Sequence, residues 1–244
     1  ARRSAPFENK IASSGAATPR EVSDPSRRAQ IDSMRKKFEE GLRVYRQRGK
    51  DLYSVPWFVV IGEPSSGKSA AIRNSGVGFP PGLHEEMRGV GGTLNMDWFF
   101  TNDAVILDTA GRLAFEEVDT SKTTEWQEFL RQLRAARPRC PINGMLVFIP
   151  VDSLKTDTAD QLETKASKIA QQLDLVQQTL GVRFPMSVVI SKADLLVGFS
   201  EFFEGIADPR EQFQMFGWSN PKPLDEQFRP EEITEALGQI RERV

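Results

Sequence analysis

The sequence contains very few of the residues that build disulfide frameworks or metal centres. Its single cysteine is Cys140 and its single histidine is His84. One cysteine excludes a disulfide within the chain, and one Cys with one His argues strongly against a zinc site. With 244 residues, 39% of them hydrophobic, the chain is expected to fold around an ordinary apolar core.

Long apolar runs and a large charge excess of one sign are missing as well. The most apolar stretches, such as residues 145–151, fall far short of the roughly 20 residues that span a bilayer. Arg2 and Arg3 are not followed by the apolar run of a signal peptide. The formal net charge of −2 lacks the positive excess of nucleic-acid binders, so no nucleic-acid partner is expected.

Composition divides the chain into three regions. Residues 1–26 are rich in Ala, Ser, Pro and Arg without apolar periodicity, which predicts a linker or disordered tail. Residues 27–50 predict a basic amphipathic helix, whose apolar stripe either packs on the next domain or binds a membrane surface or partner. The stripe consists of Ile31, Met34, Phe38, Leu42 and Tyr45. Residues 51–244 are assigned to one domain with an extra C-terminal segment.

Short apolar strands alternate with helices from residue 57 onwards. Strands are predicted at 57–61, 95–100, 104–107, 145–149 and 185–190, and helices from Lys68, around 126–133, over 158–180 and over 231–244. Turn residues at 101–103 predict a hairpin between the second and third strands. Residues 199–230, rich in Phe and Pro, are predicted to be irregular. The alternation predicts a three-layer α/β fold with a mainly parallel sheet and one antiparallel hairpin strand.

The strongest motif follows the first predicted strand and opens a helix. It is Gly62-Glu63-Pro64-Ser65-Ser66-Gly67-Lys68-Ser69, which matches the phosphate-loop pattern G-x-x-x-x-G-K-[ST]. Its glycines let backbone N–H groups curl around a di- or triphosphate, and the helix directs its positive dipole end at the phosphates. Lys68 is predicted to reach the β- and γ-phosphates, and the Ser69 hydroxyl to bind Mg²⁺.

A second motif, Asp108-Thr109-Ala110-Gly111, stands at the end of the third predicted strand. An aspartate at the carboxyl end of a strand beside a phosphate loop can hold Mg²⁺ through water. The backbone N–H of Gly111 can bind a γ-phosphate, so that the loop responds to whether this phosphate is present. The alternative is a plain turn at the exit of the strand.

A third motif, Ser191-Lys192-Ala193-Asp194, resembles the [NT]-K-x-D sequence of guanine-binding proteins, with Ser in the first place. The carboxylate of Asp194 can accept hydrogen bonds from N1–H and the exocyclic amine of guanine, whereas adenine would leave it mismatched. The aliphatic stem of Lys192 could cover the base. The alternative is that Asp194 caps the start of a helix.

Two further positions bear on turnover. Thr93 ends the segment 89–93, rich in glycine, and is predicted to meet Mg²⁺ and the γ-phosphate; the alternative is a flexible loop that enters the next strand. Many GTPases place a glutamine directly after the D-x-x-G glycine to orient the attacking water, but this chain has Arg112. Hydrolysis would then be slow, dependent on a partner, or served by Glu116 or Glu117.

Together these motifs predict a GTPase-like P-loop NTPase that binds GTP or GDP with Mg²⁺. Lys68 and Thr93 are the candidate catalytic residues, and Ser69, Thr93 and Asp108 are the candidate Mg²⁺ ligands. Residues 62–69, Gly111, Ser191, Lys192 and Asp194 are the candidate nucleotide-binding residues. Two alternatives stay open: a scaffold domain that binds nucleotide without significant turnover, which Arg112 favours, and an ATPase, which Asp194 disfavours.

The motifs lie in a sequence that resembles the cytoplasmic nucleotide-binding domain of the TssM/IcmF family, roughly over residues 50–220. The similar segments are 52–57, 73–76, 79–80, 89–101, 104–112, 141–144 and 191–196. Segment 89–112 is far more specific than a phosphate loop. The family loop often has Pro and Gly where this chain has Glu63 and Ser65. A carboxylate is therefore expected near the phosphates, where it could weaken affinity unless it points to solvent.

The resemblance implies a role and a location. The family comprises inner-membrane components of type VI secretion, with relatives in type IVB secretion. The full protein would then have transmembrane helices flanking this domain and a large periplasmic part, with partners that resemble TssL and TssJ. This domain would lie in the bacterial cytoplasm near the secretion baseplate. Nucleotide turnover is not needed in every member, so the resemblance does not imply hydrolysis.

Overall fold

The structure is a computed structural model of the chain, and it describes residues 25–47, 49, 51–78, 96–109, 111, 124–208, 210, 216–226 and 229–242. The chain divides into two compact units, Ala1–Lys192 and Ala193–Val244. The first unit contains the sheet and most helices, and the second contains the C-terminal segment. Each unit is described by itself.

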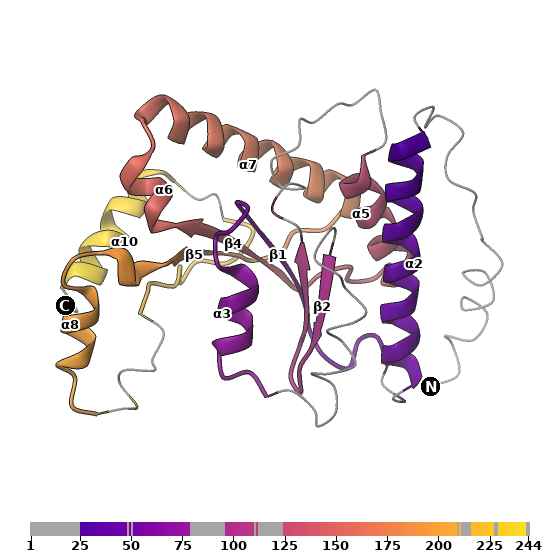
Figure 1. The fold of residues 1–244 in the computed structure, drawn as a ribbon, viewed down its shortest axis with the longest axis horizontal. Coiled ribbons are helices and arrows are strands. Elements are labelled where there is room, and N and C mark those ends of the chain that lie inside the picture. Colours follow the sequence, from indigo (N-terminus) through magenta and orange to yellow (C-terminus); the bar gives the residue numbers. More distant parts are fainter. Residues whose placement is uncertain are drawn as a thin grey trace. The chain divides into compact units, whose positions relative to one another are not determined.

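The first unit is built on a mixed, mostly parallel sheet of five strands, as the alternating pattern predicts (Figure 1). The strands are β1 (Trp57–Gly62), β2 (Met96–Phe100), β3 (Val105–Thr109), β4 (Gly144–Pro150) and β5 (Met186–Ser191), in the order β2-β3-β1-β4-β5. β1 runs parallel to β3 and β4, and β4 runs parallel to β5. β2 pairs with β3 in the antiparallel direction, which confirms the predicted hairpin.

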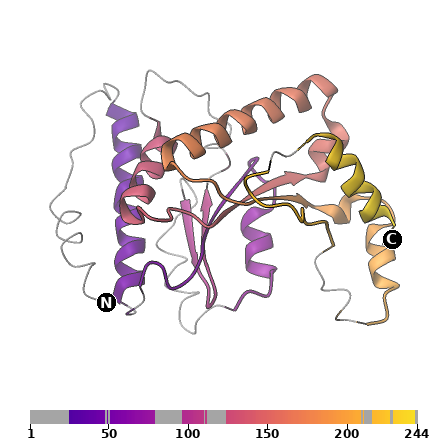
Figure 2. The same ribbon diagram turned by 180° about the vertical axis from the view of Figure 1, so that it is seen from behind.

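Helices cover both faces of this sheet, as Figures 1 and 2 show from opposite sides. The helices within the described residues of the first unit are α2 (Pro25–Gln47), α3 (Lys68–Asn74), α5 (Glu125–Ala136), α6 (Val151–Thr156) and α7 (Ala159–Leu180). α2 packs beside α5, and α5 packs beside α7. Thr124 and Thr158 form capping boxes that fix the starts of α5 and α7, since each side chain accepts a hydrogen bond from the backbone of the third helical residue.

The alternation of side chains along β1 divides the core between the two faces. Trp57, Val59 and Ile61 belong to the larger cluster with α2, α5 and α7, whereas Val60 packs with Ile72 of α3 on the other face. Burial of each large apolar side chain contributes about 1.5–3 kcal/mol. β1 is therefore held from both faces, and the loop that follows it starts from a rigid strand.

The apolar stripe of α2 packs onto this core, which confirms the packing interpretation of the N-terminal helix. All five stripe residues are at most 5% exposed. The ring of Phe38 lies 5.2 Å from that of Trp98, and a Cβ at Gly41 would lie 2.7 Å from the same indole. Glycine at this position therefore lets the helix approach β2 closely. The helix begins at Pro25, two residues earlier than predicted, since proline suits the first helical position.

The second unit contains η1 (Ala193–Leu195), α8 (Phe199–Glu204) and α10 (Glu231–Arg241). α10 confirms the predicted C-terminal helix. The prediction that residues 199–230 are irregular is wrong at α8, where the ring of Phe199 lies 4.7 Å from that of Phe203. Residues four positions apart lie on one side of a helix, so the spacing of Phe199 and Phe203 favours a helix here in spite of the nearby prolines. Among the residues that the structure describes, no helix has the length and apolarity to cross a membrane.

Candidate functional site

The segment 62–69 forms a tight loop between β1 and α3, beside β3 and β4. Gly67 has φ +82° and Ser65 has φ +59°, so the backbone turns through the left-handed region twice. A Cβ at Gly62 would lie 2.6 Å from the carbonyl oxygen of Phe148 on β4. The glycines of the motif are therefore needed for the backbone path and for the close approach of the loop to its neighbouring strand.

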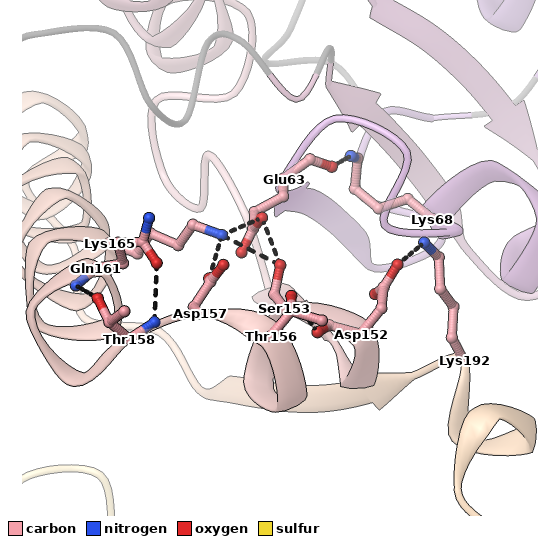
Figure 3. Close-up of polar contacts among 10 residues, drawn as sticks. All are labelled: Glu63, Lys68, Asp152, Ser153, Thr156, Asp157, Thr158, Gln161, Lys165 and Lys192. Carbon is pink, nitrogen blue, oxygen red and sulfur yellow. Dashed lines mark hydrogen bonds and ion pairs between the residues drawn. The ribbon is translucent and has the colours of Figure 1, made fainter.

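Lys68 lies inside this loop and binds its backbone. Its Nζ donates to the carbonyl oxygen of Glu63 at 2.9 Å (Figure 3). It also donates to the carbonyl oxygen of Gly62 at 3.1 Å and to Ser66 Oγ at 3.3 Å. Only 7% of the residue is exposed. Burial lowers the pKa of the Lys68 ammonium, although the charges of Asp108 and Glu63 act in the opposite direction. The ammonium is thus a preorganised cation at the start of a helix.

Ser69 and Asp108 come together from α3 and β3. The Ser69 hydroxyl donates to Asp108 Oδ2, and the other carboxylate oxygen is buried with no hydrogen-bond partner among the described residues. Burial raises the pKa of the Asp108 carboxyl, and the hydrogen bond from Ser69 and the charge of Lys68 oppose this only in part. A buried oxygen without a partner, next to a serine hydroxyl, fits a divalent cation.

No group of three His, Cys, Asp or Glu side chains that could hold a metal occurs within the described part of the chain. Because Mg²⁺ prefers octahedral coordination, a cation bound by Ser69 and Asp108 would need further oxygen ligands. Phosphate oxygens and water are the partners that Mg²⁺ commonly takes in such sites. The donor set thus fits a metal that binds together with a phosphate compound.

Gly111 brings the second motif against the phosphate loop. A Cβ at this residue would lie 2.4 Å from the backbone nitrogen of Pro64 and 2.7 Å from the carbonyl carbon of Glu63. The Thr109 hydroxyl donates to the Val60 carbonyl at 2.7 Å and joins the end of β3 to β1. The structure therefore gathers Lys68, Ser69, Asp108 and Gly111 in one place, as the order of the motifs predicts.

The Glu63 side chain leaves the loop in a direction that the sequence does not reveal. Its Oε2 accepts from Ser153 Oγ at 2.8 Å and from Lys165 Nζ at 2.7 Å, and Lys165 also pairs with Asp157 at 2.6 Å (Figure 3). The side chain of Glu63 is 18% exposed, so it points to α6 and α7 rather than to solvent. Sequence reasoning missed Ser153, Asp157 and Lys165, whose only signal is their polarity.

The base motif is divided between the two units. Ser191 ends β5, and its hydroxyl donates to the Ser66 carbonyl at 2.7 Å, which connects it to the phosphate loop. Lys192 has φ +56°, and its Nζ pairs with Asp152 Oδ2 at 2.6 Å. Asp194 belongs to η1 of the second unit and is exposed. Its role in selecting a base stays a prediction.

Four residues considered for the switch and for water positioning lie outside the described residues. They are Thr93, Arg112, Glu116 and Glu117. The predictions for these positions, and for residues 1–24, are untested by the geometry.

Comparisons with known proteins place the chain in a family. Residues 119–244 match the family described as IcmF-related N-terminal domain. In an alignment of 200 positions that covers 77% of the chain, the sequence is 36% identical to the type VI secretion system component TssM1 of Pseudomonas aeruginosa. The chain spans 18% of the length of that protein. Because the family match covers more than half of the chain, this protein belongs to the TssM/IcmF family.

Proposed function

We propose that this chain is a guanine-nucleotide-binding domain of a type VI secretion component, with a GTPase-like P-loop fold. The observation that carries the proposal is the position of Lys68 beside Ser69 and Asp108, in a glycine-dependent loop between β1 and α3. A buried ammonium, a hydroxyl and a carboxylate at one helix start suit a magnesium–nucleotide complex. The mostly parallel sheet with helices on both faces supports the same class of fold.

The residues of the loop have distinct proposed roles. Lys68 would exchange its hydrogen bonds to Gly62 and Glu63 for β- and γ-phosphate oxygens, and the backbone N–H groups of the loop would bind the same phosphates. Gly111 would offer its N–H to the γ-phosphate, because its lack of a side chain lets it lie against Pro64. These contacts would stabilise negative charge on the phosphates during water attack.

Ser69 and Asp108 would hold Mg²⁺, together with Thr93. When bound, Mg²⁺ supplies positive charge that neutralises the phosphate oxygens. Ser69 would release its hydrogen bond to Asp108 and turn its oxygen towards the metal. The charge of the metal would then compensate the buried Asp108 carboxylate, one oxygen of which has no hydrogen-bond partner among the described residues. Thr93 would respond to the presence of the γ-phosphate.

Guanine is the proposed base. Asp194 would accept two hydrogen bonds from guanine, and the stem of Lys192 would cover the ring, while Ser191 stays bound to the phosphate loop. The support for this role is the sequence of the motif and the contact of Ser191 with Ser66. An ATPase is the alternative, and the pairing pattern of a carboxylate argues against it because adenine lacks the matching donors.

A nucleotide-dependent switch with slow hydrolysis is the proposed activity. Arg112 replaces the glutamine that orients water in many GTPases, and an arginine does not act as a base. A scaffold domain that binds nucleotide without significant turnover is the rival function that this residue favours. We propose that the domain lies on the cytoplasmic side of a bacterial inner membrane, and its membership of the family supports this location. There it would act in the assembly of a secretion complex with TssL-like and TssJ-like partners.

Titration with fluorescently labelled GTP and ATP tests the core of this proposal. The domain is expected to bind GTP in the presence of Mg²⁺ and to bind ATP at least tenfold more weakly. Equal binding, or tighter binding of ATP, would exclude the guanine assignment. Single-turnover hydrolysis, measured with and without the other membrane-complex proteins, then separates the switch from the scaffold.

A further inference from the structure

An acidic residue occupies the second position of the phosphate loop, where it is unfavourable for binding phosphates. The carbonyl oxygen of Glu63 accepts from Lys68 Nζ at 2.9 Å, so its backbone belongs to the cradle itself. A carboxylate that turned into the loop would repel the phosphates and would compete with them for the Lys68 ammonium. The loop therefore needs a contact that keeps the Glu63 side chain directed away from the phosphate-binding side of the loop.

Lys165 provides such a feature from α7. Its ammonium pairs with Glu63 at 2.7 Å and with Asp157 at 2.6 Å, and it donates to Ser153 Oγ at 3.1 Å. Burial alone lowers the pKa of Lys165, but the hydrogen bonds that it donates to the Asp157 and Glu63 carboxylates raise the pKa overall, so the residue stays a cation. One ammonium is thus shared between two carboxylates in a partly buried cluster.

Rigid elements hold the cluster in place (Figure 3). Ser153 lies on α6, Asp157 caps the end of α6, and Lys165 lies in the second turn of α7. The capping box between Thr158 and Gln161 fixes the start of α7. The direction of Lys165 is consequently set by a frame that does not belong to the phosphate loop.

We propose that Lys165 is a positioning residue of the nucleotide site, which holds the Glu63 carboxylate on α6 and α7 and away from the phosphates. The inference rests on the proposed binding of nucleotide at residues 62–69. It explains how this chain accommodates a glutamate in the loop. It also assigns a role in nucleotide affinity to a residue of α7 that would not itself contact the nucleotide.

The test compares two lysines of α7. Lys165→Met removes the positioning cation, and Lys168→Met removes an equal charge three residues further along the same helix. Titration of each variant with labelled GTP and Mg²⁺ is expected to show an affinity loss of about tenfold for Lys165→Met and less than about twofold for Lys168→Met. The loss should shrink as salt is raised, because it arises from repulsion between charges.

Rescue separates positioning from a merely structural effect. In a Glu63→Gln background, Lys165→Met is expected to lower the affinity for GTP no more than Lys168→Met does, since residue 63 then has no carboxylate for Lys165 to hold. Lys165→Arg keeps a cation that can bridge two carboxylates and should retain most of the affinity. Ser153→Ala removes one hydrogen bond from a neutral donor to the Glu63 carboxylate and should weaken nucleotide binding by about twofold, again only where residue 63 is glutamate.

Each result decides between specific conclusions. If wild type binds GTP, and Lys165→Met has the same affinity for GTP as Lys168→Met, the positioning role of Lys165 is wrong and the proposed nucleotide binding stands. An equal loss in the Glu63→Gln background also overturns positioning. If wild type binds no nucleotide at all, both the proposed function and this inference fail. Thermal melts identify any variant that does not fold, and in that case Lys165→Arg and Ser153→Ala carry the test.

Discussion

The phosphate loop and the base motif each follow a parallel strand of the same sheet, yet the chain secures them in different ways. At the loop, Lys68 and Asp108 are 7% and 5% exposed, and each is hydrogen-bonded to a neighbour in the first unit. At the base motif, Lys192 is half-buried and Asp194 is exposed, and the boundary between the two units falls between residues 192 and 193. The phosphate loop therefore lies entirely within the first unit, whereas the residues of the base motif are divided between the two units.

This difference separates phosphate binding from base selection. The residues proposed to bind phosphate are already bonded to one another, so little ordering entropy remains to be lost when a ligand binds. The residue proposed to select the base, Asp194, is an exposed carboxylate of the second unit. Variants at the loop should therefore alter affinity for every nucleotide, whereas variants at Asp194 should alter only the ratio between bases.

Lys68→Ala is expected to have the largest effect. Loss of the buried ammonium removes charge-assisted contacts to the phosphates and should weaken GTP and GDP alike by about 2–3 kcal/mol, or roughly 30- to 150-fold. Titration with labelled nucleotides measures this change, with Lys168→Ala as the control for loss of a lysine elsewhere. Unchanged affinity for GTP and GDP would show that Lys68 does not bind phosphate, and the contrast between the phosphate loop and the base motif would no longer hold.

Gly111→Ala should be nearly as damaging, because the approach of this residue to the loop leaves no room for a methyl group. The new Cβ would lie 2.4 Å from the nitrogen of Pro64, which is backbone and cannot swing aside. Overpacking of this kind costs about 1–3 kcal/mol, and nucleotide binding should fall with it. Thermal unfolding and GTP titration give the two readouts.

Gly238→Ala is the matched control for this substitution. A Cβ at Gly238 meets no atom within 4 Å, and the residue lies inside α10. Alanine there should leave nucleotide binding unchanged and slightly stabilise the helix, by about 0.5–1 kcal/mol. A Gly111→Ala variant as stable and as active as Gly238→Ala would contradict the contact between Gly111 and the phosphate loop.

Much of this fold and loop can be predicted because the signals are local. β1 is an apolar run that ends at a glycine, and the next lysine opens a helix, so strand, loop and helix follow from a short window of sequence. The stripe of α2 has clear helical spacing and packs as expected. Gly67 marks one of the two left-handed turns of the loop, and Gly62 marks its close approach to β4.

Contacts distant in sequence could not be predicted in the same way. Glu63 and Lys165 are 102 positions apart, and their pairing depends on the short helix α6, which has too few residues to display an apolar period. In the sequence, Lys165 looks like any charged residue on the solvent side of a long helix. Only the turn of the chain at Asp157 brings it to the phosphate loop.

Asp194→Asn should alter the base preference without removing phosphate contacts. An amide presents a donor where the carboxylate accepted a hydrogen bond, so affinity for GTP should fall by about tenfold or more, while affinity for inorganic pyrophosphate stays unchanged. Xanthine carries a carbonyl oxygen where guanine carries its amine, and the variant should therefore bind xanthosine triphosphate better than wild type does. Competition against labelled GTP measures both ratios.

Asp225→Asn serves as the control, since it changes an exposed aspartate of the same unit. If Asp194→Asn and Asp225→Asn give the same ratio of GTP to xanthosine triphosphate, base selection does not depend on Asp194. The exposed position of this residue would then be that of an ordinary surface carboxylate.

Asp108→Asn should give the smallest effect. It should raise the stability of the protein without nucleotide but weaken the binding of GTP with Mg²⁺. Burial raises the pKa of Asp108 above its ordinary value of 3.8, so the folded state retains a proton that the unfolded state has lost. Wild-type stability is therefore lost as pH rises from about 4 through the raised pKa, whereas the asparagine variant lacks this dependence. Without nucleotide, the variant should be more stable at neutral pH by about 1 kcal/mol, the scale of a poorly satisfied buried group. Its advantage should disappear below about pH 4.

Thermal melts of wild type, Asp108→Asn and the exposed Asp103→Asn across this pH range measure the effect. The same Asp108→Asn protein should bind GTP more weakly when Mg²⁺ is present, because an amide is a poorer ligand for the metal than a carboxylate. Greater stability with weaker magnesium-dependent binding would mean that the loop retains a costly buried charge for its ligand. If the difference in stability between Asp108→Asn and wild type is the same at pH 4 and at pH 7, burial does not destabilise the charged form of Asp108. The contrast with exposed Asp194 would then lose its physical basis.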